Sequence, residues 1–419
     1  MMRVPPQRTR REVSGLIAAS AALLATPAVL RAQTAARVVV IGGGFGGASC
    51  ARALRKADGK LEVTLVEANT TFTSCPLSNE VIAGLRGIDA QQFGYDKIAA
   101  EGVRVIVQAA AAIDAQAHKA TLADGSSLSY DRLVLAPGID LDFTALQGYD
   151  EAASTAMPHA YKAGDQTLLL RKQIEAMPDG GTVAIAVPAN PSRCPPAPYE
   201  RASLIAHHLK AHKPKSKVLI SQQRLFEQAW KLLYGGMIEH IPLSQGGRVT
   251  GVDMATRTVI TEFGNYNPDV ANIIPPQKAG RIAALAGAAD RTGWCPIDAS
   301  TFASKLVPDV HVIGDACLGG GIPKSAGAAQ AQGKACAAVI ARDLTGRQSE
   351  TPPLTGVCYS IVAPDYAFSL AGVYQPKGDL FAEVEGGRSS AVDASRETRA
   401  AEVEAATTWF EALTHDAFG

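Results

Sequence analysis

A glycine-rich turn near the N-terminus constrains the fold of this chain more than any other feature. It follows a short apolar strand at 36–41 and matches the spacing G-x-G-x-x-G at Gly42, Gly44 and Gly47. A helical pattern comes next, and a second strand at 62–66 leads into Glu67. In this context the glycines allow close backbone approach, the helix N-terminus attracts a pyrophosphate, and the acid accepts from a ribose hydroxyl. The sequence therefore predicts a dinucleotide-binding domain of the Rossmann type.

Two later segments favour FAD over NAD in this domain. Residues 133–138 (LVLAPG) read as an apolar strand that ends in a turn, and 310–315 read as another strand that ends in Gly314 and Asp315. Both segments resemble parts of flavoproteins with two dinucleotide-binding domains. In those proteins the late aspartate contacts the ribityl chain of the flavin. We therefore predict that Gly314 and Asp315 contact FAD.

A helix is predicted behind the second of these segments. It begins at 323–325 and runs to about Arg342. The N-terminus of a helix favours negative charge, such as the N1–C2=O edge of a reduced flavin. Lys324 lies at this end, where it either adds to the positive charge or is an exposed lysine.

A second βαβ outline lies in the middle of the chain, but its turn differs from a phosphate-binding loop. A strand at 182–187 and a strand at 217–220 flank a helical pattern at 199–212. The intervening turn, PANPSRCPPAP, holds Cys194 among prolines, with Glu200 close behind. Proline supplies no N–H and stiffens the loop, so the turn is a poor cradle for phosphate. We infer that NAD(P)H is not the electron partner. An inert structural role for Cys194 is the alternative, because buried cysteines often behave as small hydrophobic residues.

These patterns define an α/β fold with two Rossmann-like dinucleotide-binding domains and a small C-terminal domain. The chain has 419 residues, which is long enough for two or three domains. The predicted domains are an FAD-binding domain, an inserted NAD-like domain without a nucleotide loop, and a C-terminal interface domain. Their predicted bounds are 33–147 together with 277–348, then 148–276, then 349–419. No metal site is predicted.

Residues 1–32 have the pattern of an export signal. Arginines at the start precede an Ala-rich apolar run, and Thr9-Arg10-Arg11 resembles a twin-arginine signal. An uncleaved membrane anchor is the alternative, although the run is only marginally long enough to span a bilayer. We expect a periplasmic protein with no stable membrane insertion after signal removal. The formal net charge of zero gives no indication of nucleic-acid binding.

Several longer motifs resemble those of one family. The sequence is similar to the flavoprotein subunit of flavocytochrome c sulfide dehydrogenase, a relative of the sulfide:quinone oxidoreductases. The matching stretches include CPLSNEVI, PHAYKAGDQT, SRCPPAPYERAS, IIPPQKAG, GWCPID, HVIGDA, CYSIVAPDYAFS and the terminal HDAFG. The resemblance covers nearly the whole chain after the signal.

The resemblance assigns roles to four residues. Cys75 corresponds to the cysteine that holds FAD through a thioether to the flavin 8α-methyl group, although here Pro76 follows it. Cys194 and Cys358 correspond to the partners of a redox-active disulfide above the flavin ring, and Glu200 to an acid near that disulfide. The alternatives are a free Cys75 with non-covalent FAD, a merely structural disulfide, and a Glu200 that only favours the start of a helix.

Of the seven cysteines, four receive no role from the family pattern. Cys295 is expected to be structural and Cys50 to lie in the core, whereas Cys317 and Cys336 are extra. The cysteines of an exported protein can be oxidised to disulfides. Because the number of cysteines is odd, at least one thiol is free or has another role.

The function that this resemblance implies is oxidation of hydrogen sulfide to zero-valent sulfur or polysulfide. Electrons would pass through the disulfide and FAD to a c-type cytochrome, which must be a partner because this chain has no C-x-x-C-H motif. A sulfide:quinone oxidoreductase is one alternative. It needs membrane attachment, whereas 394–413 reads as a solvated helix whose small aromatic patch suits a protein partner. Another alternative is that the chain is a docking or regulatory flavoprotein subunit. An NAD-dependent disulfide reductase would require phosphate-binding glycines near residue 188.

Overall fold

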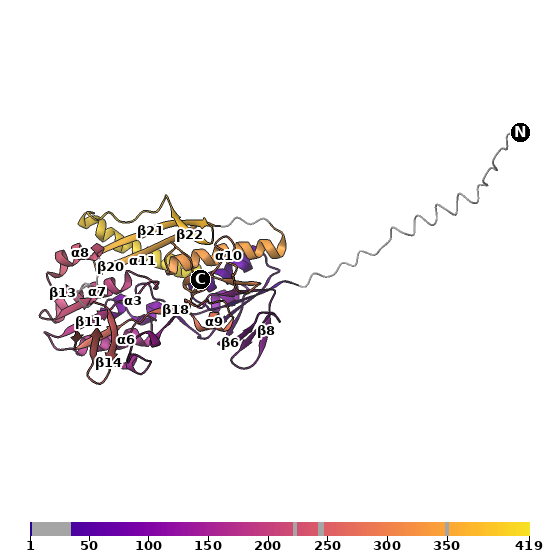
Figure 1. Cartoon of the computed structure of the whole chain (residues 1–419). Helices are drawn as coiled ribbons and strands as arrows, with labels where there is room; N and C mark the ends of the chain where they lie inside the picture. The colour runs from indigo at the N-terminus through magenta and orange to yellow at the C-terminus, as the bar shows by residue number, and fades with distance from the viewer. Residues whose placement is uncertain (2–34, 221–223, 242–246, 348–351) are drawn as a thin grey trace. The chain divides into compact units, whose positions relative to one another are not determined.

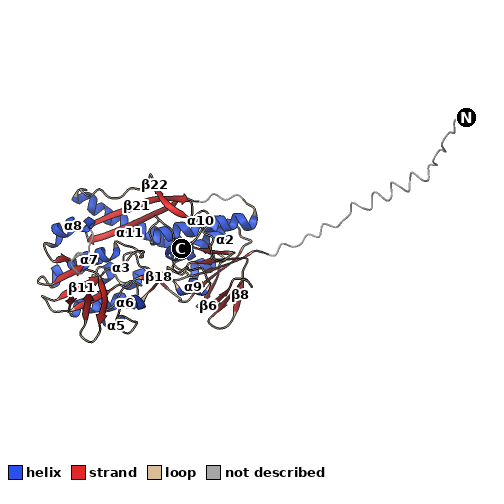
Figure 2. Ribbon diagram, viewed as in Figure 1, coloured by secondary structure: helices blue, strands red, loops and turns tan. Residues whose placement is uncertain are grey.

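The computed structural model describes residues 1, 35–220, 224–241, 247–347 and 352–419. Residues Ala36–Gly419 form one compact unit (Figures 1 and 2). The predicted export signal at 1–32 lies outside the described residues, apart from Met1, so it stays a prediction. Among the helices of the described ranges, none is long and apolar enough to cross a membrane.

A parallel five-stranded sheet forms the first part of the unit. Its strands follow the order β19-β9-β1-β2-β5. Their bounds are β1 Arg37–Ile41, β2 Glu62–Glu67, β5 Arg104–Val107, β9 Arg132–Leu135 and β19 Val310–Val312. The apolar runs that predicted β1, β2, β9 and β19 are mostly buried, as expected for a parallel sheet covered on both faces, whereas the edge strand β5 was not predicted and is more exposed.

Two helices with small residues at their interface pack beside this sheet. They are α2 (Phe45–Ala57) and α10 (Ala326–Thr345). A Cβ atom at Gly333 would lie 2.3 Å from the carbonyl oxygen of Gly46, so the two backbones meet where no side chain intervenes. This contact joins the glycine-rich turn to the late helix of the same domain.

A second parallel sheet has the order β13-β12-β11-β17. Its strands are β11 Thr182–Ala186, β12 Lys217–Ile220, β13 Ile238–His240 and β17 Val270–Ile273. The larger helices beside it are α6 (Asp165–Ala176), α7 (Ala197–His212) and α8 (Arg224–Tyr234). The sequence therefore placed this βαβ unit to within two residues at each boundary. The proposed domain limits stay a prediction, because 36–419 forms a single unit by its contacts.

The remaining short elements connect the two sheets or cap their edges. Small antiparallel sheets are formed by β3 Phe72–Thr73 with β4 Gln92–Phe93, by β6 Ala110–Asp114, β7 Lys119–Leu122 and β8 Ser127–Ser129, by β10 Ile139–Leu141 with β18 Gln277–Ala279, and by β14 Val249–Asp253, β15 Thr258–Thr261 and β16 Asn265–Tyr266. The short helices are α3 Ser78–Ile82, α4 Asp96–Ala100, α5 Ala153–Ala156 and α9 Arg281–Leu285, with single 3₁₀ turns at Ile88–Gln91, Phe143–Ala145 and Gly314–Ala316.

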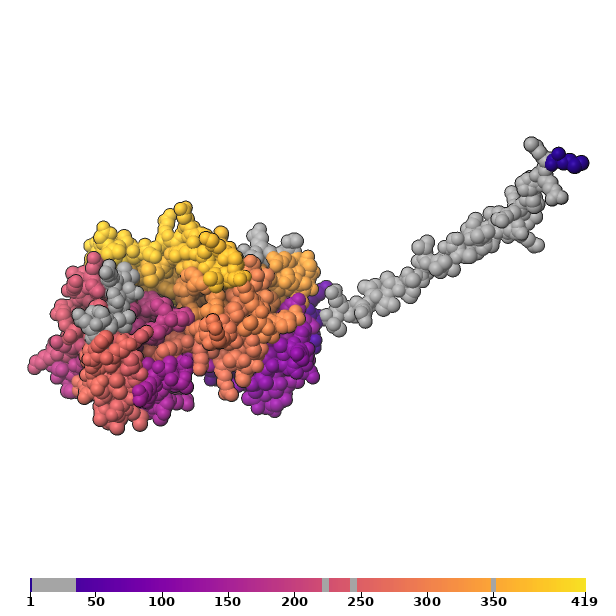
Figure 3. Space-filling view, viewed as in Figure 1, coloured from indigo at the N-terminus to yellow at the C-terminus, as the bar shows by residue number. Residues whose placement is uncertain are grey.

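The C-terminal segment contacts both the domain that contains the first parallel sheet and the domain that contains the second. It contains the antiparallel strands β20 (Leu354–Ala363), β21 (Tyr366–Lys377) and β22 (Leu380–Val384), followed by α11 (Arg396–Phe418). Strand β20 packs against α10 on one side and α7 on the other. The space-filling view shows this segment, in yellow, along one edge of the unit (Figure 3).

Most of the aromatic patch expected on the last helix is packed inside the protein, and Trp409 is half-buried. Phe410 and Phe418 are buried, 4% and 3% exposed. Phe418 stacks on Phe72 and Phe93, with ring centroids 5.2 Å apart in both pairs. The end of the chain therefore belongs to the same buried apolar cluster as the strands of the first sheet.

Candidate active site

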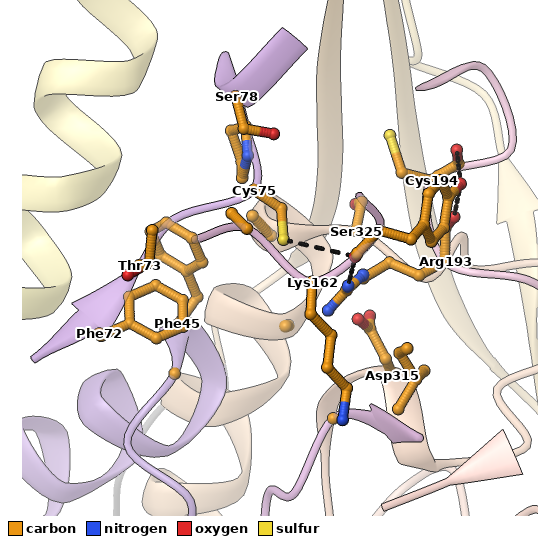
Figure 4. A pocket seen from close by; sticks show the side chains of 18 of the residues that line it. Phe45, Phe72, Thr73, Cys75, Ser78, Lys162, Arg193, Cys194, Asp315 and Ser325 are labelled. Atoms are coloured by element: carbon orange, nitrogen blue, oxygen red, sulfur yellow. Dashed lines mark hydrogen bonds between the residues drawn. The ribbon is translucent and has the colours of Figure 1, made fainter. Parts of the chain in front are cut away.

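A cavity of about 600 Å³ brings together most of the residues predicted to be functional. It is lined by Gly42, Gly44, Glu67, Cys75, Cys194, Glu200, Gly314, Asp315 and Cys358. Its size lies within the range of small-molecule and cofactor sites. Of the predicted site residues, only Gly47 and Lys324 do not line it. Figure 4 shows several of the lining side chains from close by.

The glycine-rich turn packs so closely against neighbouring backbone that a side chain would collide with it. A Cβ at Gly42, which has φ +102°, would lie 2.3 Å from the carbonyl oxygen of Ala136, and a Cβ at Gly47 would lie 1.8 Å from the carbonyl oxygen of Gly42. The Glu67 carboxylate accepts from the backbone N–H of Gly43 at 2.7 Å and faces the cavity. A turn with these contacts at a helix N-terminus fits the pyrophosphate and ribose of a dinucleotide.

Asp315 fits a polar part of the same cofactor. Its Oδ1 is buried and has no hydrogen-bond partner among the described residues. A buried polar atom of this kind is costly unless a partner completes it. Burial raises the pKa of the Asp315 carboxyl, while Arg193 and Lys324 lower it. A hydroxyl of the ribityl chain would supply the missing donor, so the residues present fit FAD.

Lys324 differs from its predicted role. Its Nζ donates to the carbonyl oxygens of Asp315 and Cys317, at 2.7 Å each, and lies 4.0 Å from the centre of the Trp294 ring. The ammonium group therefore supports the backbone that carries Asp315 rather than facing the cavity. Ser325, the next residue, lines the cavity and accepts from the N–H of Ala328 as the N-cap of α10.

Cys75 lies at the edge of the cavity between β3 and α3. Its Sγ is 3.9 Å from the carbonyl oxygen of Tyr161, and a dashed line from the sulfur marks this contact in Figure 4. The side chain is half-buried and lines the cavity. This position, on the same cavity as the glycine-rich turn, fits a sulfur that meets the cofactor.

Cys194 and Cys358 come to the cavity from opposite parts of the chain. Cys194 lies in the proline-rich turn after β11, with φ +45°, and its N–H donates to the carbonyl oxygen of Lys324 at 2.8 Å. Cys358 lies on β20. Burial raises the pKa of the Cys194 thiol well above its usual value, and Cys358 and Glu200 raise it further. The two thiols thus line the same cavity. Both are free thiols in the structure, and a disulfide between them stays a prediction.

Glu200 lies on the first turn of α7 and is 6% exposed. One carboxylate oxygen accepts from the N–H of Ile361 at 3.1 Å, and the other accepts from the side-chain amide of Asn79 at 3.0 Å. Burial raises the pKa of the Glu200 carboxyl to about 7, although these two hydrogen bonds oppose the shift. A carboxyl with this pKa can both take up and release a proton near neutral pH.

Two further residues of the site were not singled out from the sequence. Asn79 links Glu200 to Arg201, because its side-chain oxygen accepts from Nε of Arg201 at 3.0 Å. Tyr161 donates from its hydroxyl to the carbonyl oxygens of Arg193, at 2.5 Å, and Cys194, at 2.9 Å. Both lie inside motifs that carried the family resemblance, CPLSNEVI and PHAYKAGDQT, and this is the signal that marks them.

The other four cysteines lie outside the cavity lining as two neighbouring pairs. Cys295 and Cys317 face each other across a parallel bridge between their backbones. Cys50, which is fully buried on α2 as expected for a core residue, lies next to Cys336 of α10. Burial raises the pKa of Cys295 to about 12 and that of Cys317 to about 11, so both remain protonated thiols at neutral pH.

The unusual pKa of Glu200 predicts how stability varies with pH. The unfolded carboxyl ionises near 4.5 and the folded one near 7, so the folded state binds more protons in this window. Glu200 should therefore lower the free energy of unfolding by about 3 kcal/mol as pH rises from 4.5 to 7, whereas His159, whose pKa is lowered by burial to about 3, acts in the opposite direction. The free energy of unfolding of Glu200→Gln, measured with denaturant relative to the wild type, should therefore rise by this amount between the two ends of the window. Glu404→Gln, at an exposed position of α11, is the control and should vary with pH as the wild type does.

Comparison with known proteins agrees with this geometry. Residues 167–275 match the family model described as "Sulfide dehydrogenase [flavocytochrome c] flavoprotein chain, central". Residues 350–418 match "Flavocytochrome c sulphide dehydrogenase, flavin-binding", and 36–168 match "Pyridine nucleotide-disulphide oxidoreductase".

Individual relatives point the same way. The chain is 64% identical over 45 residues to the sulfide dehydrogenase [flavocytochrome c] flavoprotein chain of Chlorobaculum thiosulfatiphilum, covering 11% of this chain and 94% of that one. It is 23% identical over 331 residues to the mitochondrial sulfide:quinone oxidoreductase of Mus musculus, covering 74% of this chain and 71% of that one.

Solved structures share the fold. The sulfide:quinone oxidoreductase from Aquifex aeolicus has a TM-score of 0.72 at 19% identity, covering 91% of this chain and 92% of that one. Putidaredoxin reductase, in its covalent complex with putidaredoxin, has a TM-score of 0.64 at 18% identity, covering 84% and 88% of the two chains.

The fold and the cavity define a flavin-dependent oxidoreductase with two dinucleotide-binding domains, which confirms the predicted fold class. Within that class, the chain belongs to the family of sulfide dehydrogenase (flavocytochrome c) flavoprotein chains. It is thus a member of the sulfide-oxidising flavoproteins, and FAD-binding domains make up much of its length.

Proposed function

We propose that this protein oxidises hydrogen sulfide to zero-valent sulfur or polysulfide and passes the electrons to a c-type cytochrome partner. The observation that carries the proposal is the meeting of Cys194, Cys358 and Glu200 on the cavity that the glycine-rich turn also lines. These residues come from three separated parts of the chain, and a sulfur pair, a titratable acid and a dinucleotide cradle are the parts that this chemistry needs.

The first step is attack of hydrosulfide on a disulfide between Cys194 and Cys358. The sulfur of hydrosulfide bonds to one cysteine sulfur, the bond between the two cysteines breaks, and the other cysteine leaves as a thiolate. The attacked cysteine now carries a persulfide, –S–SH. The Glu200 carboxylate takes the persulfide proton, which its pKa of about 7 permits.

FAD, when bound, supplies a two-electron acceptor for this sulfur chemistry and can release electrons singly to a haem. The residues that would hold it are the glycines of the turn, Glu67, Gly314 and Asp315, with Cys75 as a covalent tether. In the proline-rich turn the N–H of Cys194 donates a hydrogen bond to the carbonyl oxygen of Lys324. This turn supports the inference that NAD(P)H is not the electron partner.

A cytochrome acceptor and a quinone acceptor are both represented among the relatives. The printed name of the Chlorobaculum protein includes flavocytochrome c, and the names of the mouse and Aquifex proteins include quinone. The cytochrome proposal is supported by the two sulfide dehydrogenase family models. A periplasmic location after export fits a soluble c-type cytochrome partner and is part of this proposal.

The test is an anaerobic titration of the FAD-loaded protein with sulfide, followed by addition of an acceptor. We expect sulfide to bleach the flavin absorbance and oxidised cytochrome c to restore it. Flavin that sulfide leaves oxidised would overturn the proposed function. Reoxidation by a water-soluble quinone but not by cytochrome c would instead assign the chain to the quinone-linked alternative.

The proposed thioether makes a prediction about Cys75. Acid precipitation of the wild-type protein should leave the flavin in the yellow pellet, because a covalent bond survives unfolding. In Cys75→Ser the flavin should appear in the supernatant, while the protein still binds FAD through the glycine-rich turn. Flavin that is released equally from both proteins would show that Cys75 is a free thiol.

A further inference from the structure

Asn79 lies between two charged side chains from the start of α7. It is 5% exposed, belongs to α3 and lines the cavity. Its Nδ2 donates to Oε2 of Glu200 at 3.0 Å and to the carbonyl oxygen of Ala197 at 3.2 Å. Its Oδ1 accepts from Nε of Arg201 at 3.0 Å. An amide nitrogen carries two hydrogens, so both are used within the protein and neither is left for a molecule in the cavity.

The orientation of the Asn79 amide follows from the chemistry of its partners. A guanidinium group only donates hydrogen bonds, so the amide oxygen must face Arg201 and the amide nitrogen must face Glu200. The other N–H groups of Arg201 donate to the Asn272 side chain and to the carbonyl oxygens of His159 and Ala160, at 2.6–3.0 Å. Arg201 is therefore held in place, and Glu200 meets a donor rather than an acceptor at Asn79.

The second donor to Glu200 comes from a distant part of the chain. Oε1 of Glu200 accepts from the N–H of Ile361 at 3.1 Å, and Ile361 lies on β20, the strand that carries Cys358. The two carboxylate oxygens are thus held by two separate elements, α3 and β20. Because a buried carboxylate lacks water, its ionised form depends on such donors. Removing one donor would favour the protonated acid, which cannot take up a further proton.

Charged and titratable groups from four parts of the structure face Glu200. They are Glu80 on α3, Arg201 on α7, Cys358 on β20 and Cys194 in the proline-rich turn. Burial raises the pKa of the Glu200 carboxyl and Glu80 adds to this, whereas the two hydrogen bonds and Arg201 lower it. Burial also raises the pKa of both thiols, and the charge of Glu200 raises it further. An ionised Glu200 thus opposes a thiolate beside it, and this repulsion ends when the carboxylate takes up a proton.

We propose that Asn79 is a positioning residue that holds Glu200 as an oriented carboxylate, ready to take the persulfide proton. The inference rests on the proposed function and adds a residue that acts through Glu200 rather than on the sulfur. In this step the S–H bond of the persulfide breaks, its proton bonds to a carboxylate oxygen of Glu200, and the electron pair stays on sulfur. The transfer needs no oxidant or reductant. The Asn79 amide keeps the carboxylate ionised until the proton arrives.

The first test is the pH profile of flavin bleaching by sulfide in FAD-loaded Asn79→Asp. This substitution keeps an oxygen toward Arg201 and replaces the donor to Glu200 with a second acceptor. In the wild type, the limiting rate at saturating sulfide should fall below a midpoint near pH 7, where Glu200 becomes protonated. In Asn79→Asp that midpoint should rise by about one pH unit or more, and the rate should recover at higher pH. Asn267→Asp, the same change at an exposed loop position, is the control and should keep the wild-type midpoint.

The second test exchanges the two hydrogen-bonding partners and needs no sulfide. In the double variant Asn79→Asp with Glu200→Gln, the new amide can donate to the new carboxylate, so the hydrogen bond is restored with its roles reversed. The thermal unfolding midpoint of the double variant should therefore recover most of what Asn79→Asp alone loses. Its rate of flavin bleaching should stay as slow as that of Glu200→Gln, because no carboxylate remains at position 200.

Two results would each overturn the positioning role. One is an unchanged midpoint of the pH profile in Asn79→Asp, and the other is a double variant no more stable than Asn79→Asp. The stability comparison decides the question even if Asn79→Asp folds poorly, because the double variant is expected to fold. A wild-type flavin that sulfide does not bleach would contradict the proposed function instead. The two failures are distinct, because the exchange of hydrogen-bonding roles is measured without sulfide.

Discussion

Serine in place of Cys194 or Cys358 is expected to slow the bleaching of the flavin by sulfide by at least about a thousandfold. Each substitution removes one sulfur of the proposed disulfide, so hydrosulfide has no S–S bond to attack and no persulfide can form. The two cysteines act as one unit, and the double variant should therefore be no slower than either single variant. Rapid-mixing measurements of flavin absorbance under anaerobic conditions give these rates directly.

Two controls separate the loss of chemistry from the loss of the site. Each variant should still be bleached by dithionite, because a strong chemical reductant does not need the sulfur pair. Cys50→Ala removes a sulfur from α2, outside the cavity lining, and should react with sulfide at the wild-type rate. If the Cys194 and Cys358 variants were also bleached by sulfide as fast as the wild type, the disulfide step would be wrong.

Local patterns predicted the strands and the turn of the site well. The strand predicted at 217–220 is β12, and the one at 62–66 is β2 with Glu67 as its last residue. Apolar runs of this length, bounded by turn residues, fix a buried strand without help from distant parts of the chain. The glycine spacing did the same for the turn, where a Cβ at Gly47 would meet the carbonyl oxygen of Gly42, five residues earlier.

Interactions between distant residues were beyond the reach of those patterns. The proline-rich turn indicated a missing phosphate loop, but not that the Tyr161 hydroxyl would hold the carbonyl oxygen of Cys194. Glu200 suited a helix start, and its burial beside Asn79 and Ile361 follows from the packing of α7 against α3 and β20. Burial is what raises its pKa, so this chemical property appears only once the domains are assembled.

The two interpretations that changed have a common physical cause. Lys324 and the aromatic residues of α11 were interpreted from local charge and polarity. In the structure Nζ of Lys324 donates to two carbonyl oxygens and lies over the Trp294 ring. Phe418 stacks on Phe72 and Phe93. In each case a tertiary contact outside the residue's own helix determines where the side chain points, and a lysine or an aromatic residue has no local signal for such a partner.

Alanine in place of Gly47 is expected to remove most of the bound FAD and to destabilise the protein by about 3 kcal/mol or more. Helix propensity alone would favour alanine over glycine on α2 by about 1 kcal/mol. The added Cβ, however, would lie 1.8 Å from the carbonyl oxygen of Gly42, so the turn must open and the steric effect outweighs the propensity. Gly59→Ala, where no heavy atom lies within 4 Å of the new Cβ, is the matched control and should keep its FAD. The FAD-to-protein absorbance ratio and the thermal unfolding midpoint measure both effects, and a fully loaded, equally stable Gly47→Ala protein would contradict the close approach that shapes this cradle.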